Sequence, residues 1–237
     1  MSTSSKPLLE VIACTVDDAV AAERGGADRI ELVRDLGRGG LTPDIALAAA
    51  VVDAVRIPVR VMIREEEPFV VSSPEVAQAL CDAAREMCGL AIDGLVIGFL
   101  DASGGVDEAL LGRVLRGTRG MRVTFHRAFE EVLDQRAGFV VLNRWPQIDR
   151  VLVNGGSGTT GQRLSVLLAL ASLAGDRLRV LSAVGSDREL LRAVCAAPDL
   201  GEAHVGRAAR DPEVVDATVS AVKVAELVAL RDAVRRD

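Results

Sequence analysis

The chain of 237 residues has no tyrosine, one tryptophan, five phenylalanines and two histidines, His126 and His204. Any chemistry that needs an imidazole must use one of those two rings. Scarce aromatic side chains exclude the stacking platforms on which single-stranded nucleic acids bind. A formal net charge of −6 also argues against a surface for polynucleotides or anionic membranes, which needs clustered positive charge. We therefore expect no nucleic-acid partner.

Long apolar runs and paired cysteines are also missing. No uninterrupted apolar run approaches the ~18 residues of a membrane span, and the polar segment 1–7, which we expect to be disordered, contains no apolar signal core. We expect a cytoplasmic protein with no membrane partner. The four cysteines form no Cys-x-x-Cys pair, so neither a disulfide framework nor a zinc finger is indicated.

Short β-branched or apolar runs alternate with helical patterns along the chain. The predicted strands are Leu8–Ala13, Asp28–Val33, Pro58–Arg64, Gly94–Phe99, Arg122–His126, Asp149–Asn154, Leu178–Ala183 and Glu202–Val205. The predicted helices are Val16–Arg24, Pro43–Val55, Pro74–Cys88, Val106–Arg116, Glu130–Leu142, Thr160–Leu173, Asp187–Cys195 and Pro212–Arg235. Strict alternation over eight units predicts an α/β fold, a single (β/α)₈ TIM-type barrel over residues 8–237. The alternative, an open doubly wound sheet, lacks its Gly-x-Gly-x-x-Gly turn after the first strand.

Alternate residues in several strands are polar. In the third strand, Val59 and Val61 share one face, whereas Arg60 and Arg64 share the other. The polar faces should point to the barrel axis. They carry Glu10, Glu31, Arg64, Thr124, His126, Asn154, Glu202 and His204. Most of these residues stand late in their strands, near the C-terminal mouth where enzymes of this fold place their chemistry. Buried carboxylates are costly unless paired, so Glu10 and Glu31 need Arg64, a histidine or a metal ion. An internal ion-pair network that only fills the barrel is the alternative.

Two residues at the end of the fifth strand are candidates for chemistry. His126 suits general acid/base work or metal ligation. Arg127 suits an anionic group, because its planar fork binds carboxylate or phosphate, unless it pairs with Glu130 or Glu131. The predicted catalytic set is His126, Glu31, Glu10 and Arg64. The predicted ligands of a divalent cation are Glu10, Glu31, His126 and His204.

Glycine-rich turns follow the last three strands. Gly155 and Gly156 come after Asn154, whereas Gly185 and Gly206 come after the seventh and eighth strands. Their amides and the following helices suit an anion, so we expect these residues, with Arg127, to bind an anionic group of a small-molecule ligand. An ordinary turn is the alternative for each. Earlier in the chain, Thr42 and Pro43 predict a helix capped by Thr42.

Several segments resemble the CutC, or copper homeostasis, family. They are Leu9-Glu10-Val11, Gly25-Gly26-Ala27-Asp28-Arg29-Ile30-Glu31-Leu32, Gly39-Gly40-Leu41-Thr42-Pro43, Met62-Ile63-Arg64, Thr124-Phe125-His126-Arg127-Ala128-Phe129 and Glu202-Ala203-His204. The resemblance implies a cytoplasmic (β/α)₈ barrel that forms a homo-oligomer, a dimer or tetramer, and handles copper. In members linked to copper, cysteines stand where this chain has Ile12 and Val33. Soft Cu(I) prefers thiolate or thioether ligands, which neither position supplies.

The sequence therefore predicts a CutC-family copper homeostasis protein with a small-molecule or metal site at the barrel mouth. The alternative is a metabolic enzyme, independent of copper, that performs acid–base chemistry on a small anionic or polyhydroxylated substrate. Lyase, isomerase and hydrolase reactions all fit that alternative. A third possibility is an oligomeric scaffold whose interior charges are only structural.

Overall fold

The computed structural model describes residues 6–118 and 120–234. Its strands are β1 (Leu8–Ala13), β2 (Arg29–Leu32), β3 (Val59–Met62), β4 (Gly94–Ile97), β5 (Arg122–Phe125), β6 (Ile148–Val153), β7 (Arg179–Ala183), β8 (Glu202–Val205), β9 (Arg210–Asp211) and β10 (Thr218–Val219). Its α-helices are α1 (Val16–Gly25), α2 (Ile45–Ala54), α3 (Pro74–Met87), α4 (Glu108–Gly117), α5 (Gln135–Asn143), α6 (Thr160–Ala174), α7 (Arg188–Ala196) and α8 (Ala221–Ala233). Short 3₁₀ helices span Leu36–Arg38 (η1), Arg127–Glu131 (η2) and Arg207–Ala209 (η3).

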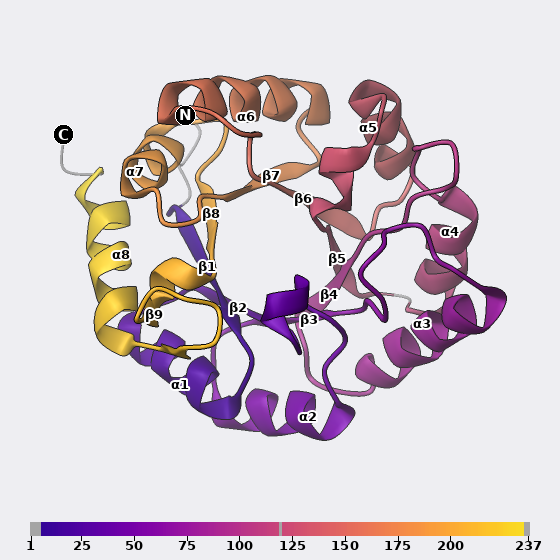
Figure 1. Cartoon of the computed structure of the whole chain (residues 1–237), viewed down its shortest axis with the longest axis horizontal. Coiled ribbons are helices and arrows are strands. Elements are labelled where there is room, and N and C mark those ends of the chain that lie inside the picture. Colours follow the sequence, from indigo (N-terminus) through magenta and orange to yellow (C-terminus); the bar gives the residue numbers. More distant parts are fainter. Residues whose placement is uncertain (1–5, 119, 235–237) are drawn as a thin grey trace.

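Strands β1 to β8 form a closed parallel barrel in sequence order, and β1 pairs with β8 to close it. Figure 1 shows the α-helices as a ring around the strands. This confirms the predicted (β/α)₈ barrel. The predicted segment 1–7 falls partly outside the described residues, which begin at Lys6, and the Lys6 ammonium pairs with Asp28 at 2.7 Å. Among the described residues, no helix is both long enough and apolar enough to cross a bilayer.

The helices and strands meet through the apolar faces that the sequence pattern indicates. Helix α3 begins where Pro74 occupies its first turn and the Ser73 hydroxyl accepts from the Val76 amide. The helix buries Leu80, Ala84 and three other side chains against the outer faces of the strands. Burial of such apolar area, at about 25 cal/mol per Å², is the main favourable term for the fold.

Helix α2 begins later than predicted. Its first residue is Ile45 rather than Pro43, and the preceding Asp44 makes no side-chain cap bond. The Thr42 hydroxyl instead donates to the Arg64 carbonyl at 3.0 Å and accepts from the Arg64 amide at 2.8 Å. The prediction of Thr42 as a helix cap was therefore wrong, because this hydroxyl holds the loop after β2 against the end of β3.

The predicted helix Glu130–Leu142 is divided into η2 and α5. Val132 has extended backbone and ends η2, and the Asp134 carboxylate caps α5 by accepting from the Ala137 amide. Leu133, between them, is 84% exposed. Apolar residues stand on both sides of this break, at Val132 and Leu133 and again from Ala137 onward, so the hydrophobic pattern did not reveal it.

The predicted helix Pro212–Arg235 is also shorter, and Arg235 lies outside the described residues. Its first part instead contains β10, which pairs antiparallel with β9 just before Pro212, and α8 begins only at Ala221. The buried Arg210 guanidinium donates to the Ala217 carbonyl, and the Asp18 carboxylate accepts from the Val219 amide at 2.8 Å. These side-chain bonds to backbone stabilise extended backbone before the helix.

The barrel interior contains a charged layer below the mouth. The buried Arg60 guanidinium donates twice to Asp149, both at 2.8 Å, and once to the Thr124 hydroxyl at 2.6 Å. Arg150 donates to both oxygens of Glu202, at 2.6 and 2.9 Å. Glu202 is the first residue of β8 and therefore lies at the end of the strand away from the mouth. Its carboxylate is paired with Arg150 in this layer. Ion pairs that fill the barrel therefore account for one part of the polar interior.

Candidate functional site at the barrel mouth

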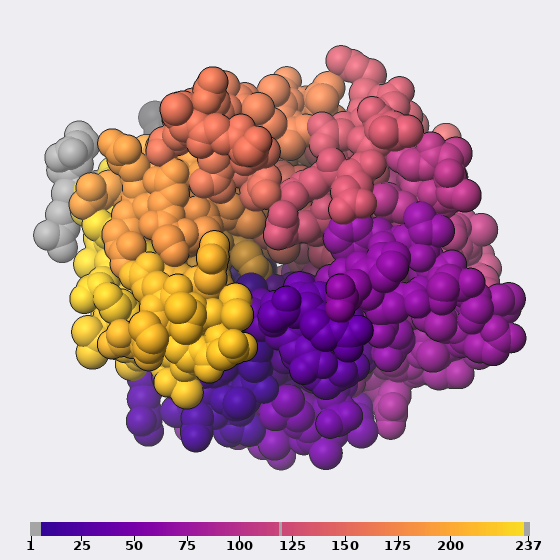
Figure 2. Space-filling model, in the orientation of Figure 1, coloured from indigo at the N-terminus to yellow at the C-terminus, as the bar shows by residue number. Residues whose placement is uncertain are grey.

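A pocket of about 360 Å³ opens at the end of the barrel where the strands finish. Its apolar walls include Ile12, Met62, Phe69 and Leu152, and its polar lining consists of Glu31, Arg64, His126, Arg127, Glu130, Glu131, His204 and Arg207. In Figure 2 the indigo and violet N-terminal part and the yellow C-terminal part meet over this face. The pocket therefore joins residues from both ends of the chain and is the candidate functional site.

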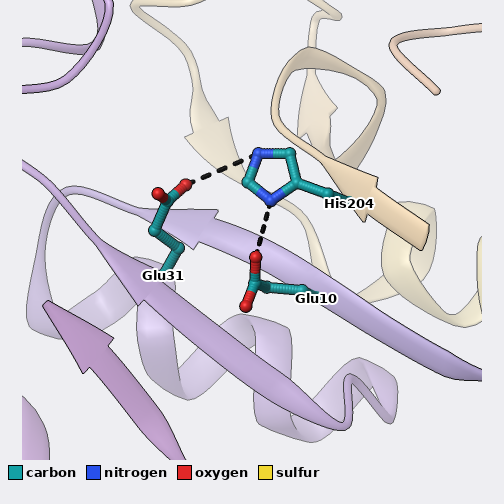
Figure 3. A group of neighbouring side chains, drawn as sticks. All are labelled: Glu10, Glu31 and His204. Atoms are coloured by element: carbon teal, nitrogen blue, oxygen red, sulfur yellow. Dashed lines mark hydrogen bonds and ion pairs between the residues drawn. The ribbon is translucent and has the colours of Figure 1, made fainter. Parts of the chain in front are cut away.

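A chain of buried polar groups forms part of the pocket wall. Figure 3 shows Glu10 and Glu31 directed at opposite nitrogens of the His204 ring. His204 Nδ1 lies 2.7 Å from Glu10 Oε1, and His204 Nε2 lies 3.5 Å from Glu31 Oε2. The other Glu10 oxygen accepts from Arg29 Nε at 2.5 Å. The register explains the group, because Glu10 of β1 is the partner of both Arg29 in β2 and His204 in β8.

The surroundings of Glu10 and Glu31 shift the pKa values of the two carboxyls in opposite directions. Burial opposes the charged form of Glu10, but the Arg29 cation and the His204 bond outweigh it and hold its pKa well below the usual range. Burial raises the pKa of Glu31 to about 7, and the nearby His204 only partly offsets this. Burial would lower the pKa of His204, but the Glu31 and Glu10 carboxylates raise it. Near neutral pH, Glu31 can therefore gain or lose a proton beside a ring whose protonated form the two carboxylates favour.

His126 lies in the same pocket in a different state. Its Nδ1 accepts from the Ala128 amide at 3.1 Å, so the proton of the neutral ring is on Nε2. Burial, with the Arg64 cation as a second cause, lowers the pKa of His126 to about 3. Nε2 is buried and has no hydrogen-bond partner among the described residues. The ring is thus a neutral donor rather than a proton carrier.

The predicted partnership of Arg64 with the inward glutamates does not form. The Arg64 guanidinium donates to the carbonyls of Glu66, Glu67 and Gly39, and it lies 4.8 Å from the centre of the Phe69 ring. Glu10 is paired with Arg29 and His204, not with Arg64, which was one of the partners considered from the sequence. Arg64 still lines the pocket, but its bonds shape the loop between β3 and α3.

The predicted anion-binding residues are only partly brought together. Arg127 lines the pocket but donates to Glu130 at 2.9 to 3.2 Å, which is the ion pair given as its alternative. Gly185 and Gly206 line the pocket, whereas Asn154, Gly155 and Gly156 do not. The Asn154 side chain accepts from the Gly156 amide at 2.6 Å, which is a local turn.

Arg207 is a pocket residue that the sequence reasoning did not place in the site. It is exposed, it follows Gly206 at the end of β8, and no other described residue pairs with its guanidinium. The signal was available, because loops after the seventh and eighth strands of such barrels often bind phosphate. Arg29 was likewise visible on the polar face of its strand but was not assigned a partner.

Few ligand atoms of the predicted cation site remain free to bind an ion. Glu10, Glu31 and His204 each place one ligand atom within 4.8 Å of the others, whereas His126 is outside this group. Both Glu10 oxygens, however, already bond to Arg29 and His204, and the Arg29 cation repels a second cation. Two donors, Glu31 and His204 Nε2, face the pocket. Zinc sites supply three or four protein ligands, so this group suits a proton better than a zinc ion.

Comparison with known proteins places the chain in a family. The family model described as "CutC family" matches residues 7–208. A human relative named "Copper homeostasis protein cutC homolog" is 38% identical over 188 residues, which cover 78% of this chain and 68% of that protein. A CutC family protein of Mesorhizobium japonicum is 33% identical over 199 residues, covering 84% of this chain and 76% of that protein.

A solved structure supports the same fold. The CutC protein of Streptococcus agalactiae superimposes with a TM-score of 0.77 at 24% identity, covering 84% of this chain and 98% of that one. The shared barrel agrees with the match of the family model over most of the chain. The chain belongs to the CutC family.

Proposed function

We propose that this protein takes part in copper homeostasis, the role that the name of its human relative gives, and that it acts by binding a small anionic molecule in the mouth pocket. One observation supports the site: Arg207, whose guanidinium pairs with no other described residue, lines the same pocket as the buried pair Glu31 and His204. An available guanidinium in a pocket with a buried acid and imidazole suits an anionic ligand with polar substituents.

Copper itself is a poor fit for this pocket as a thiolate-bound Cu(I) ion. Met62 is the one sulfur-containing residue among those that line the pocket. Ile12 and Val33 pack with Met62 and Val96 in an apolar cluster inside the barrel. The Cys14 sulfur accepts from Arg210 at 3.5 Å and does not line the pocket. The copper role is therefore proposed to act through the small ligand.

A complementation experiment tests the role and the site together. A bacterial strain that lacks its own CutC gene is grown at raised copper with the wild-type chain, Glu31→Gln, Arg207→Gln or the exposed control Arg116→Gln. We expect the wild type and Arg116→Gln to restore growth, and both pocket variants to fail. No rescue by the wild type would reject the copper role, whereas equal rescue by every variant would reject the pocket as its site.

A binding experiment separates the anion from the metal. Purified protein is titrated with inorganic phosphate, Cu(I) and Cu(II), with Arg207→Gln as the test variant and Arg116→Gln as the control. We expect phosphate to raise the melting temperature of the wild type and the control but not of Arg207→Gln. Cu(I) binding tighter than micromolar, lost in a Met62→Leu variant, would instead support a copper centre in the pocket.

The family resemblance also supports a cytoplasmic homo-oligomer, and we propose a dimer or tetramer. Light scattering coupled to size-exclusion chromatography measures the mass directly. A single species at the 25.0 kDa of one chain would reject this part of the proposal.

The second candidate function is an enzyme that transfers protons. The 3.5 Å approach of Glu31 to His204 favours it, because an acid with a pKa of about 7 beside a positioned imidazole is the usual equipment of general acid/base catalysis.

A further inference from the structure

Two buried polar atoms of the mouth pocket lack partners. Among the described residues, six buried side-chain atoms make no hydrogen bond, and two of them belong to residues that line this pocket: Glu31 Oε1 and His126 Nε2. Both side chains are nearly inaccessible, with 2% and 3% of their residue surface exposed. Buried polar atoms in native proteins usually have a partner, so an orphaned pair beside one cavity points to a ligand.

The two atoms have opposite hydrogen-bonding characters. Glu31 Oε1 is an acceptor when the carboxyl is ionised, whereas His126 Nε2 is a donor because Nδ1 already accepts from the Ala128 amide. A ligand that satisfies both must offer a hydroxyl or an acidic C–H to Glu31 and a carbonyl oxygen to His126. A compound in which a hydroxyl group stands next to a carbonyl group has this pattern.

Arg207 defines the third group of the ligand. Its guanidinium is exposed at the pocket and no described residue pairs with it, unlike Arg127, which is held by Glu130. An unpaired guanidinium binds phosphate or carboxylate through two parallel bonds. The pocket volume of about 360 Å³ also suits a molecule of metabolite size.

We propose that the pocket binds a small hydroxycarbonyl compound with a phosphate or carboxylate group, and that Glu31 moves a proton between its carbons. This inference rests on the proposed function, in that the mouth pocket must bind a small anion. Glu31 carboxylate takes the hydrogen of the hydroxyl-bearing carbon as a proton, and the electron pair of the broken C–H bond forms an enediolate. The His126 Nε2–H donates to the carbonyl oxygen on which negative charge develops. Return of the proton to the neighbouring carbon, with proton transfer between the two oxygens, completes an isomerisation without any oxidant.

Glu10 and His204 act as positioning residues in this scheme. Glu10 fixes the ring of His204 through Nδ1 at 2.7 Å, and the opposite nitrogen lies 3.5 Å from Glu31. A protonated His204 stabilises the ionised form of Glu31 without touching the ligand carbons. Its loss should therefore move the pH at which Glu31 becomes active, in addition to lowering the rate.

Deuterium exchange tests the proton transfer. The full-length protein is incubated in D₂O with dihydroxyacetone phosphate, ribulose 5-phosphate and 3-hydroxypyruvate, and the hydrogens next to the carbonyl are followed by NMR against a protein-free sample. We expect exchange with at least one of these compounds. Glu31→Gln should bind it but exchange about 100-fold more slowly, and Arg207→Gln should bind about tenfold more weakly. Arg116→Gln should match the wild type.

Further variants protect the test against loss of folding. Glu31→Asp retains the acid one methylene further back, so it should fold and still exchange slowly. Glu10→Gln should shift the pH profile of exchange. Binding without exchange above the protein-free rate, or exchange unchanged in Glu31→Gln and Glu31→Asp, would overturn this inference and leave the binding proposal standing. Failure of every compound and of phosphate to bind would overturn both.

Discussion

Glu31 and His204 face each other in the barrel mouth, with Glu31 Oε2 3.5 Å from His204 Nε2, although 173 positions separate them in the chain. The closure of the barrel by β1 and β8 produces this approach, since Glu10 on β1 lies between the two strands that carry them. The arrangement places a carboxyl with a pKa of about 7 beside an imidazole whose pKa the neighbouring carboxylates raise, and both groups lie at the pocket.

The two histidines should show opposite protonation states. Because the chain has only two, a ¹H–¹⁵N spectrum of the imidazoles contains two ring systems. We expect His126 to stay neutral, with its proton on Nε2, at every pH above its pKa of about 3. We expect His204, whose pKa is raised, to be cationic at pH 6.5. Two neutral rings at that pH would contradict the proposed proton arrangement.

The stability contribution of Glu31 should fall as pH rises. Its folded pKa of about 7 lies above the unperturbed 4.5, so the unfolded chain releases this proton first between these values. Ionisation then favours the unfolded state. In urea titrations, the free energy of unfolding of wild type minus that of Glu31→Gln should decrease across this window by about 3 kcal/mol. A constant or rising difference would show that Glu31 is ionised in the folded protein.

Removing the Glu10 charge should destabilise the barrel. Glu10→Gln leaves the buried Arg29 and His204 without their shared anion. We expect the free energy of unfolding to fall by about 3 kcal/mol, the usual effect of breaking a buried ion pair. The exposed Glu86→Gln should change it by less than about 0.5 kcal/mol. Similar values for both variants would mean that the Glu10 bonds contribute little.

Gly98 should be essential for the position of His126. A Cβ at residue 98 would stand 2.3 Å from both Cε1 and Nδ1 of the His126 ring. Gly98→Ala should therefore displace the ring, change its ¹⁵N signals and reduce stability by about 2 kcal/mol. Gly37→Ala is the control, because no atom lies within 4 Å of its added Cβ. An unchanged His126 spectrum in Gly98→Ala would contradict this packing.

The lower charged layer should be structural rather than functional. Arg60→Met removes the donor to the Thr124 hydroxyl and one of the two arginine partners of Asp149, the other being Arg150. We expect a loss of about 3 kcal/mol in the free energy of unfolding with phosphate affinity unchanged, and Arg116→Met should alter neither. A loss of phosphate affinity in a folded Arg60→Met protein would show that this layer belongs to the ligand site.

Much of the fold was predictable because barrels impose a simple periodicity. The ranges Leu8–Ala13 and Glu202–Val205 are strands with the predicted bounds, and alternate residues of β3 divide as predicted between the core and the interior. Errors concentrate where tertiary contacts override local pattern. The start of α2 depends on the bonds of Thr42 to the Arg64 backbone, and at the break before α5 the Leu133 amide donates to the Gly104 carbonyl; the hydrophobic pattern encodes neither contact.

The sequence by itself determined the (β/α)₈ barrel, the family and the inward placement of the two histidines and two glutamates. Only the tertiary structure decided how they pair. In the folded chain, Glu10 pairs with Arg29 and His204 rather than with Arg64, and Arg207 has no partner among the described residues. The physical reason is that period-two alternation fixes the face of a side chain, whereas strand register and barrel closure fix its neighbours, across 194 positions in the case of Glu10 and His204.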